Sequence, residues 1–522
     1  MPDKLQGKKV AHDSSGSATA LKRQVTPSTE AVTMPLAVDL DGTLLLTDTL
    51  FEALAEHLLQ RPFWAILQLI QLPFGIAKVK DRMTADVSLD VDMLPVNEQV
   101  LAYCHEAKAA GREVWLVSAA DQKIVDRIAE RFGIFDRAIG SDGKTNNKGS
   151  AKARLLEETA PEGFEYIGDS PADLKVWKRA ARASYVGKGE PRRQSIEKMG
   201  VAVARAFDRP EAGIKAWLKA LRLHQWAKNA LIFVPAILSM TIVNPAIFIK
   251  LLIALPLLGV MASGTYILND LLDLQADRGH RSKHKRPFAS GCIKLWQGFV
   301  AAPCLILGGL VGGLLLSPAF ATTMLCYLVI TLLYSMRLKR VALGDAVALS
   351  FLYTLRLLMG AVLATVALSS WLLVFSMFLF VSLSMAKRHV EVLQLAASGE
   401  RHVANRGYRA GDAGLTLGLG LATATAALLI LVLSIIESDW PPGLYSAPDA
   451  LWATPIILSA WVMRVWLLAN RGELHDDPVV FAVKDGQSLI AGAALVLSFL
   501  AARVLPPDFI SAFNLDHVFG AR

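Results

Sequence analysis

Residues 35–43 read PLAVDLDGT, an apolar run that ends in two aspartates, a glycine and a threonine. Similar runs recur at 113–119 (EVWLVSA), 164–168 (FEYIG) and 183–187 (ASYVG), with helical stretches between them. This alternation predicts buried strands in a parallel α/β sheet of the Rossmann-like class. Because ligands of such sheets bind at the carboxyl ends of the strands, catalytic and metal-binding residues are expected there.

Asp39 and Asp41 follow the first predicted strand. In an extended segment residues i and i+2 point to the same side, so one carboxylate can attack a phosphorus while the other protonates the leaving oxygen. Ser118 can hold a phosphoryl oxygen, and Lys148 in NNKGSAK can neutralise charge between nucleophile and phosphate. Asp169 and Asp173 in GDSPAD can hold Mg²⁺.

This set resembles the haloacid dehalogenase-like phosphatases over residues 34–187. The resemblance implies that Asp39 forms an aspartyl-phosphate, Asp41 is the acid/base, and Ser118 and Lys148 hold the phosphoryl group. It also implies that Asp39 and Asp169 bind Mg²⁺ with support from Asp173, and that residues 49–97 form a small helical cap. The alternative is a degenerate domain kept for assembly or anchoring.

The remainder of the chain has another character. Of the 522 residues of the whole chain 53% are hydrophobic and 19% charged, and the mean hydropathy is +0.40, which indicates a soluble part joined to a membrane part. Uncharged runs such as 295–336 are long enough to cross a bilayer. We expect an all-α polytopic bundle of about nine spans, centred near 236, 260, 306, 327, 355, 378, 425, 460 and 494.

Charge predicts how this bundle is oriented. The segments 273–296, 337–345, 387–412 and 464–484 are rich in Lys and Arg, whereas the turns near 244, 317, 369 and 437–450 contain none. By the positive-inside rule the soluble domain lies in the cytoplasm and the carboxyl terminus outside, in an inner or plasma membrane. The net charge of +8 therefore reflects a membrane partner, and no nucleic acid is expected.

The expected domains are a disordered tail (1–33), the phosphatase-like domain (34–205), a connector with an interfacial helix (206–228), the membrane domain (229–505) and a second tail (506–522). Residues 188–210 are interpreted as a polar connector. Ile214, Trp217, Leu218 and Leu221 recur at helical spacing. Such an amphipathic helix either lies on the membrane surface or packs against the soluble domain.

A second site is predicted in residues 269–277, which read NDLLDLQAD. On one continuous helix Asp270, Asp273 and Asp277 share a face, where a divalent cation would bridge them to a pyrophosphate. The alternative is a charged cytoplasmic loop. Further candidates for phosphate contacts follow at Arg278, Arg281, Lys283, Lys285 and Arg286.

The NDxxDxxxD pattern resembles the UbiA superfamily of intramembrane prenyltransferases over residues 221–505. The segments 222–229 (RLHQWAKN) and 384–392 (SMAKRHVEV) are similar to the branch that includes decaprenyl-phosphate phosphoribosyltransferase. The resemblance adds these candidate substrate-binding residues: Lys228, Asn269, Tyr334, Lys339, Asp345 and Arg356. Asp345 and Arg356 are expected on one face of a span, either reaching the polar cavity or forming a structural ion pair.

In that branch a polyprenyl phosphate attacks phosphoribosyl pyrophosphate, and Mg²⁺ is the cofactor. The resemblance therefore implies a bifunctional membrane enzyme whose phosphatase domain removes the 5-phosphate of the product; the alternative is that this domain acts on a soluble metabolite. Transfer of a prenyl group to an aromatic ring stays open, as does a transporter or scaffold with a regulatory phosphatase domain. A homo-oligomer is also left open.

Overall fold

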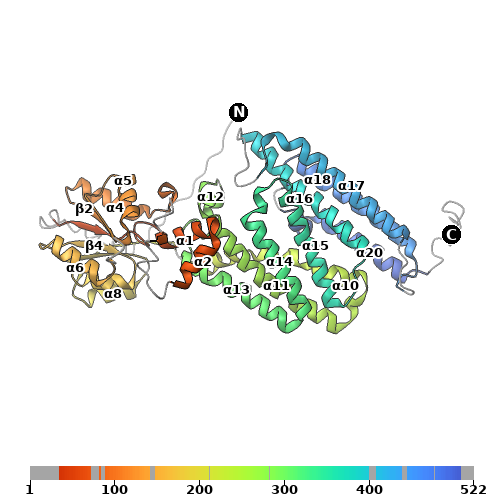
Figure 1. Cartoon of the computed structure of the whole chain (residues 1–522), viewed down its shortest axis with the longest axis horizontal. Helices are drawn as coiled ribbons and strands as arrows, with labels where there is room; N and C mark the ends of the chain where they lie inside the picture. The colour runs from red at the N-terminus through yellow and green to blue at the C-terminus, as the bar shows by residue number, and fades with distance from the viewer. Residues whose placement is uncertain are drawn as a thin grey trace, which may run out of the picture.

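The computed structural model describes residues 34–71, 82–83, 89–141, 147–187, 189–210, 212–280, 282–398, 407–437, 444–474 and 477–506. The two predicted terminal tails, apart from residue 506, and Arg281 lie outside these ranges. Figure 1 shows an α/β domain at one end of the molecule and a helical bundle at the other.

The α/β domain is built on a six-stranded parallel sheet with the order β3-β2-β1-β4-β5-β6. This confirms the predicted parallel α/β class. The strands are β1 (Leu36–Val38), β2 (Val114–Asp121), β3 (Arg137–Ser141), β4 (Glu165–Gly168), β5 (Arg182–Val186) and β6 (Ala202–Phe207). The sheet is covered by α4 (Glu98–Ala109) and α5 (Gln122–Phe132) on one face and by α6 (Ser150–Thr159), α7 (Leu174–Trp177) and α8 (Glu190–Glu197) on the other.

Alternation along β1 divides the core into two layers. Leu36 and Val38 belong to the cluster that contains residues of α4 and α5, whereas Ala37 packs with residues of α6 and α7. All three residues are fully buried. A strand that is apolar on both faces is what a central parallel strand requires, because helices cover both sides of the sheet.

The polar connector predicted at 188–210 is wrong. Residues 190–197 form α8, and β6 pairs in parallel with β5, so the sheet extends to Phe207. β6 is an edge strand whose burial pattern is mostly exposed, and for that reason its sequence, AVARAF, lacks the apolar run of a central strand. The link to the membrane domain is therefore only the few residues between Phe207 and Ile214.

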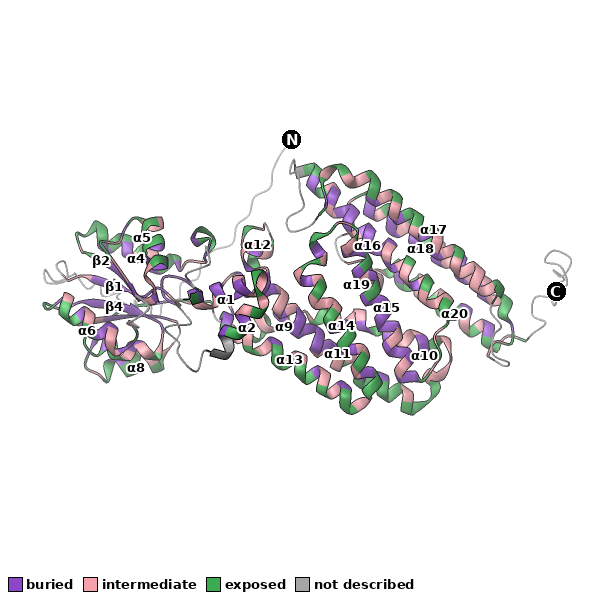
Figure 2. Cartoon of the chain, viewed as in Figure 1, coloured by how far each residue is buried: buried purple, intermediate pink, exposed green. Residues whose placement is uncertain are grey.

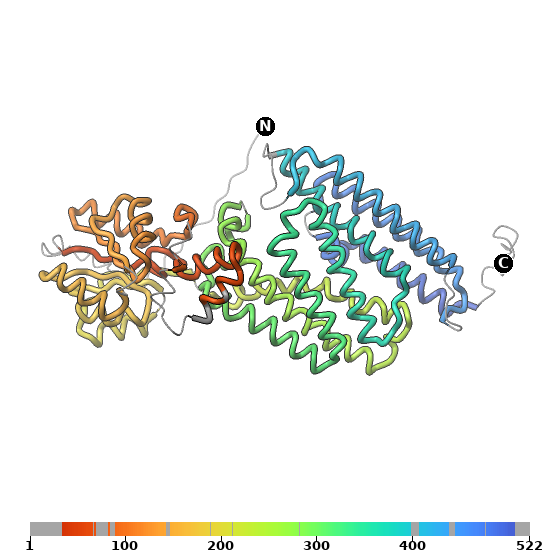
Figure 3. Tube along the Cα trace, viewed as in Figure 1, coloured from red at the N-terminus to blue at the C-terminus, as the bar shows by residue number. Residues whose placement is uncertain are grey.

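Two cap helices, α1 (Thr49–Gln60) and α2 (Pro62–Gln71), leave the sheet and lie beside the bundle (Figure 3). Phe51 of α1 stacks on Phe299 at 5.8 Å between ring centroids. Ala55 joins a hydrophobic cluster with Ile267, Leu271 and Phe288 of the membrane domain. Because the two domains share this cluster, they are packed together.

Eight helices of the described ranges are long and apolar enough to span a membrane. They are α11 (Pro245–Leu272), α13 (Leu295–Leu316), α14 (Pro318–Met336), α15 (Gly344–Ala364), α16 (Ser370–Ser398), α17 (Ala413–Glu437), α18 (Ala453–Asn470) and α20 (Gly486–Val504). They coincide with eight of the expected spans. Figure 2 shows α15 among the other helices, whereas α13 and α17 carry many exposed residues.

The ninth expected span, near 236, is not a continuous helix of that length. It consists of η5 (Leu223–Phe233), a 3₁₀ segment, and α10 (Val234–Leu238), which has a proline in its first turn. At about 2.0 Å per residue a 3₁₀ segment rises faster than an α-helix, so this stretch still covers much of the bundle's length. Shorter helices complete the domain: α9 (Ile214–Leu221), α12 (Leu274–Gly279) and α19 (Pro478–Lys484).

The amphipathic helix α9 packs on the membrane domain and not on the α/β sheet. Ala220 is buried in the cluster that also contains Ile267, and Trp217 meets Phe288 edge-on at 6.5 Å. Ile214 is 79% exposed and Leu218 45% exposed. The exposed apolar side is consistent with contact to a membrane surface.

Candidate functional sites

The candidate residues of the α/β domain meet at the carboxyl ends of three adjacent strands. Asp39 directly follows β1, Ser118 lies near the end of β2, and Asp169 follows β4. Together they line a cavity of about 210 Å³ with the remaining predicted residues of this site: Asp41, Lys148 and Asp173. The fold thus brings together six residues that the sequence spreads over 135 positions, from 39 to 173.

Three carboxylates in this cavity form a group suited to a cation. Oxygen atoms of Asp39, Asp169 and Asp173 all lie within 4.8 Å of one another, and the three side chains are buried. Burial raises the pKa of Asp39 to about 7, an effect that Lys152 opposes and Asp173 reinforces. Burial likewise raises the pKa of Asp169. Since a Mg²⁺ ion prefers oxygen ligands, this donor set fits it.

The two acids after the first strand are held differently. Asp39 accepts a hydrogen bond from the backbone N–H of Leu40 at 2.9 Å. Asp41 accepts from the backbone N–H of Thr49 at 2.9 Å, at the start of cap helix α1. Gly42 adopts φ +79°, and a Cβ there would lie 2.5 Å from Oδ2 of Asp169. A glycine is therefore required for this close approach.

The contact expected for Lys148 is made by Lys152. The Lys152 Nζ lies 2.7 Å from Oδ1 of Asp39 and 3.0 Å from the Tyr166 hydroxyl, and the side chain is buried. Lys148 also lines the cavity, four residues earlier and before α6 begins. Both lysines occur in the quoted NNKGSAK, of which Lys148 was the one predicted to make this contact. Since α6 begins at Ser150, the second points inward from its first turn.

Asp173 is fully engaged in orienting the site. Its Oδ1 accepts the Tyr166 hydroxyl at 2.8 Å, and its Oδ2 accepts the backbone N–H groups of Asp169 and Ser170. The Ser170 hydroxyl donates to the same oxygen at 2.7 Å. This network fixes the turn that carries Asp169.

In the membrane domain the aspartates do not lie on one continuous helix. α11 ends at Leu272, Asp273 is its C-cap, and α12 begins at Leu274. Each carboxylate nevertheless meets a cation. Arg286 donates to Asp270 at 3.1 Å and to Asp277 at 2.6 Å, and Arg222 also donates to Asp270. We call Asp270, Asp273 and Asp277 with these partners the aspartate cluster.

Lys339 completes the aspartate cluster from the second loop. Its Nζ lies 2.6 and 2.8 Å from the two oxygens of Asp273 and 3.4 Å from Oδ1 of Asn269. Tyr334, on the last turn of α14, is half-buried. Among the described residues, the carboxylates that lie close enough together to hold one metal ion are Asp39, Asp169 and Asp173 of the α/β domain. In the aspartate cluster, cations occupy the carboxylates.

The other basic candidates of this segment are placed apart from the aspartate cluster. Arg278 forms a buried ion pair with Glu52 of cap helix α1, at 2.5 Å. Lys285 is exposed, and its backbone carbonyl accepts from Lys219; Lys283 is half-buried in the same 3₁₀ turn. The contact of Arg278 with the other domain was not foreseeable from its place in a predicted phosphate-binding run.

A second polar group lies around Asp477, which the sequence did not single out. Its carboxylate contacts Lys228 Nζ at 2.9 Å, Lys387 Nζ at 3.6 Å and the Tyr353 hydroxyl at 2.8 Å. We call these four residues the Asp477 cluster. Asp477 follows a Glu-x-His-Asp run beyond the last quoted motif, and the loop 464–484 holds Glu473 and Asp476 as well, so nothing in the sequence distinguished Asp477 from its acidic neighbours.

Asp345 and Arg356 are not paired. Asp345 is fully buried and lies 2.9 Å from Nε of Arg388, and it accepts the Tyr408 hydroxyl at 2.7 Å. Arg356 donates to Asn229 at 3.1 Å and to the Tyr327 hydroxyl at 2.7 Å. The alternative of an ion pair between them is therefore wrong, because 11 positions of a helix separate the two side chains by about 16 Å along its axis.

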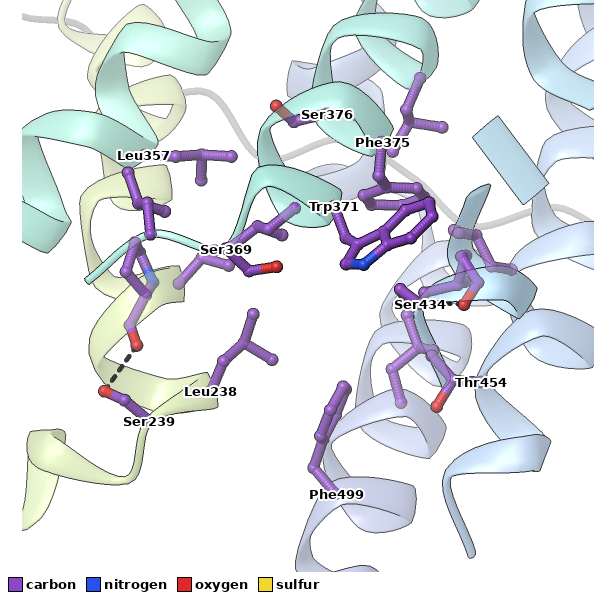
Figure 4. Close-up of a pocket in the computed structure, with 18 of the residues that line it drawn as sticks. Leu238, Ser239, Leu357, Ser369, Trp371, Phe375, Ser376, Ser434, Thr454 and Phe499 are labelled. Carbon is purple, nitrogen blue, oxygen red and sulfur yellow. Dashed lines mark hydrogen bonds between the residues drawn. The ribbon is translucent and has the colours of Figure 1, made fainter. Parts of the chain in front are cut away.

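An apolar cavity of about 880 Å³ opens in the same bundle (Figure 4). Figure 4 shows Trp371 and Phe375 of α16 pointing toward Thr454 of α18 and Phe499 of α20 across it. Phe380, which also lines the cavity, stacks on Tyr353 of the Asp477 cluster at 4.8 Å. The cavity is thus separated from that cluster by one aromatic pair.

Known proteins match both halves of the chain. The model of the "UbiA prenyltransferase family" matches residues 232–484, and that of "haloacid dehalogenase-like hydrolase" matches residues 36–178. The chain is 41% identical to "Uncharacterized protein y4nM" of Sinorhizobium fredii, over 90% of this chain and 91% of that one. It is 33% identical to "Nodulation protein NoeC" of Azorhizobium caulinodans, over 54% of this chain and 92% of the relative.

A third relative is "Decaprenyl-phosphate phosphoribosyltransferase" of Mycobacterium tuberculosis, 30% identical over 35% of this chain and 62% of that protein. These matches confirm both resemblances read from the motifs. The chain belongs to the UbiA prenyltransferase family and carries an N-terminal haloacid dehalogenase-like hydrolase domain.

Proposed function

We propose that the membrane domain transfers phosphoribose from phosphoribosyl pyrophosphate to a polyprenyl phosphate. An oxygen of the lipid phosphate attacks C1 of the ribose, the bond from C1 to the pyrophosphate oxygen breaks, and pyrophosphate leaves with the electron pair. The relative of Mycobacterium tuberculosis named for such a transfer supports this substrate class. We further propose that the soluble domain and both sites face the cytoplasm.

The observation that carries the proposal is that an excess of cationic side chains lies beside a large apolar cavity in the same bundle. The aspartate cluster and the Asp477 cluster together hold more cations than carboxylates, among them Arg222, Arg286 and Lys339 in the first and Lys228 and Lys387 in the second. Cations that are largely shielded from water inside a bundle are costly unless anions join them, so phosphorylated substrates fit this excess. The 880 Å³ apolar cavity beyond Tyr353 suits an isoprenoid chain.

Asp270, Asp273 and Asp277 would hold Mg²⁺, which would supply charge stabilisation to the leaving pyrophosphate. The residues of the chain then orient the reactants. Arg286, which pairs with Asp270 and Asp277, contacts a phosphate group of the substrate beside them. Arg356, fixed by Tyr327 and Asn229, holds an anionic group deeper in the bundle.

We propose that the α/β domain is a phosphatase. Asp39 attacks the phosphorus, the bond from phosphorus to the ester oxygen breaks, and Asp41 protonates that oxygen. Water, which loses its proton to Asp41, then hydrolyses the aspartyl-phosphate, releases phosphate and regenerates Asp39. Ser118, Lys148 and Lys152 hold the phosphoryl oxygens. Asp39, Asp169 and Asp173 would hold Mg²⁺, which supplies charge neutralisation. The transfer leaves a 5-phosphate on the lipid-linked ribose, and this ester is the substrate that we assign to the phosphatase.

Labelled phosphoribosyl pyrophosphate and polyprenyl phosphate supplied to membranes test the transfer. Label should enter the lipid phase with the wild type and with Asp39→Asn, but not with Asp270→Asn. Phosphorylated lipid should accumulate only with Asp39→Asn. Equal amounts of the 5-phosphate in both would refute the assigned phosphatase substrate, and a prenylated aromatic without labelled lipid would refute the transfer itself.

A further inference from the structure

One wall of the phosphatase cavity comes from the membrane domain. Lys294, Leu295 and Trp296 line the cavity that contains Asp39 and Asp169. These three residues are the N-cap and the first two residues of α13, a candidate membrane span. The cavity is therefore completed only when both domains are packed together.

The wall carries positive charge into the cavity. Lys294 Nζ lies 3.4 Å from Oδ2 of Asp169, and Arg209 Nη1 lies 3.2 Å from the same oxygen. Arg209 also donates to the carbonyls of Gly42 and Leu46, which fixes its position. Since two cations share one carboxylate oxygen, positive charge exceeds what Asp169 neutralises. The Lys294 side chain is 46% exposed, so its amino group remains accessible from the cavity mouth.

The two domains are tightly packed beside this wall, where Gly291 of the membrane domain meets Leu46 of the α/β domain. Gly291 adopts φ +71°, and a Cβ there would lie 2.9 Å from the carbonyl oxygen of Leu46. Nearby, the buried ion pair of Glu52 with Arg278 joins the cap helix to the membrane domain, and Thr47 of the cavity donates to Glu52 at 2.5 Å. The wall is thus held in place on both sides.

We propose that Lys294 and Trp296 determine the specificity of the phosphatase. This inference rests on the proposed phosphatase function and deepens it. Asp39, Ser118 and Lys152 hold the phosphoryl group that is removed, while Lys294 and Arg209 bind a second anionic group of the same substrate. The preferred substrate is therefore a sugar that carries two phosphates, one of them on the membrane side. Trp296 packs against the sugar between them.

Kinetics of the full-length protein in detergent, with two soluble probes, test this role. Ribose 1,5-bisphosphate carries a second phosphate, and ribose 5-phosphate lacks it. The wild type should show the lower KM for the bisphosphate. Lys294→Met should raise that KM roughly tenfold, the scale of one charge-assisted hydrogen bond, and should raise the KM for ribose 5-phosphate much less, so that the preference for the bisphosphate is lost. Lys294→Arg should restore the preference.

A second variant and a matched control separate the outcomes. Gly291→Leu should push the wall away from Leu46 and should abolish the same preference with no charge removed. Lys178→Met, an exposed lysine of the α/β domain, should behave as the wild type. If Lys294→Met leaves both KM values unchanged, or lowers kcat equally for both probes, the wall has no part in specificity although the phosphatase stands. If the wild type is no more active than Asp39→Asn, both proposals fail.

Discussion

At the scale of single residues, Lys148 and Lys152 are the two candidates for neutralising charge beside the proposed nucleophile Asp39. Lys152 is buried and forms an ion pair with Asp39, whereas Lys148 lines the cavity and forms no such pair with that carboxylate. Removing one partner of a buried ion pair leaves the other charge uncompensated, so Lys152→Met should lower phosphatase kcat by roughly 10²- to 10³-fold, and Lys148→Met by less.

The measurement is steady-state hydrolysis of a phosphate ester by full-length protein, with Lys178→Met as the control for loss of a surface lysine. A larger loss in Lys148→Met than in Lys152→Met would return the central role to Lys148. The sequence predicted that a lysine of NNKGSAK would lie beside Asp39, but it did not predict which one, because sequence spacing does not show where α6 begins. Once Ser150 starts the helix, Lys152 is carried toward Asp39.

At the scale of elements, the 3₁₀ segment η5 depends on close packing against two helices. A Cβ on Gly360 of α15 would lie 2.0 Å from the carbonyl oxygen of Ile232. A Cβ on Gly259 of α11 would lie 2.5 Å from the Trp226 ring. Since a backbone carbonyl cannot rotate away, Gly360→Ala should destabilise the membrane domain by roughly 1–3 kcal/mol.

Thermal denaturation of the detergent-solubilised protein measures this effect. Gly308→Ala is the matched control, because nothing lies within 4 Å of a Cβ placed there. Equal midpoints for the two variants would show that η5 is not packed against α15 as described. Hydropathy predicted the eight long helices well, because each is a simple apolar run. It treated the stretch centred near 236 as a ninth, because composition does not distinguish a 3₁₀ segment with a proline after it from a continuous helix.

The aspartate cluster and β6 likewise combine features that local sequence patterns predict with features that depend on long-range contacts. Spacing predicted that Asp270 and Asp277 would come together, and Arg286 does join them. The break at Asp273 was not predictable from spacing, and neither was the contact of Asp273 with Lys339, which comes from another loop. β6 was missed because an edge strand needs no apolar run, and its pairing with β5 is a long-range contact that no local pattern records.

At the scale of the whole molecule, the path of the chain and its charges point to one topology. The segment that precedes α11 starts near the α/β domain, where Arg222 meets Asp270, and reaches the far end, where the Tyr445 hydroxyl donates to Leu238. Eight spans then follow, an even number, so α20 also ends far from the α/β domain (Figure 1). The cations Lys294, Lys339 and Lys387 all make their ion pairs at the near end.

We therefore expect the near end in the cytoplasm and the carboxyl terminus outside, because Lys and Arg are retained on the cytoplasmic side. Alkaline phosphatase, which is active only outside the cytoplasm, fused after residue 522 or after Ser317 should be active. Fused after Ala342 it should be inactive, since that position follows the basic loop with Lys339. An inactive fusion at 522 beside an active one at 317 would mean that one of the later helices does not cross. Inactivity at both, with activity at 342, would invert the whole protein and place both candidate sites outside the cell.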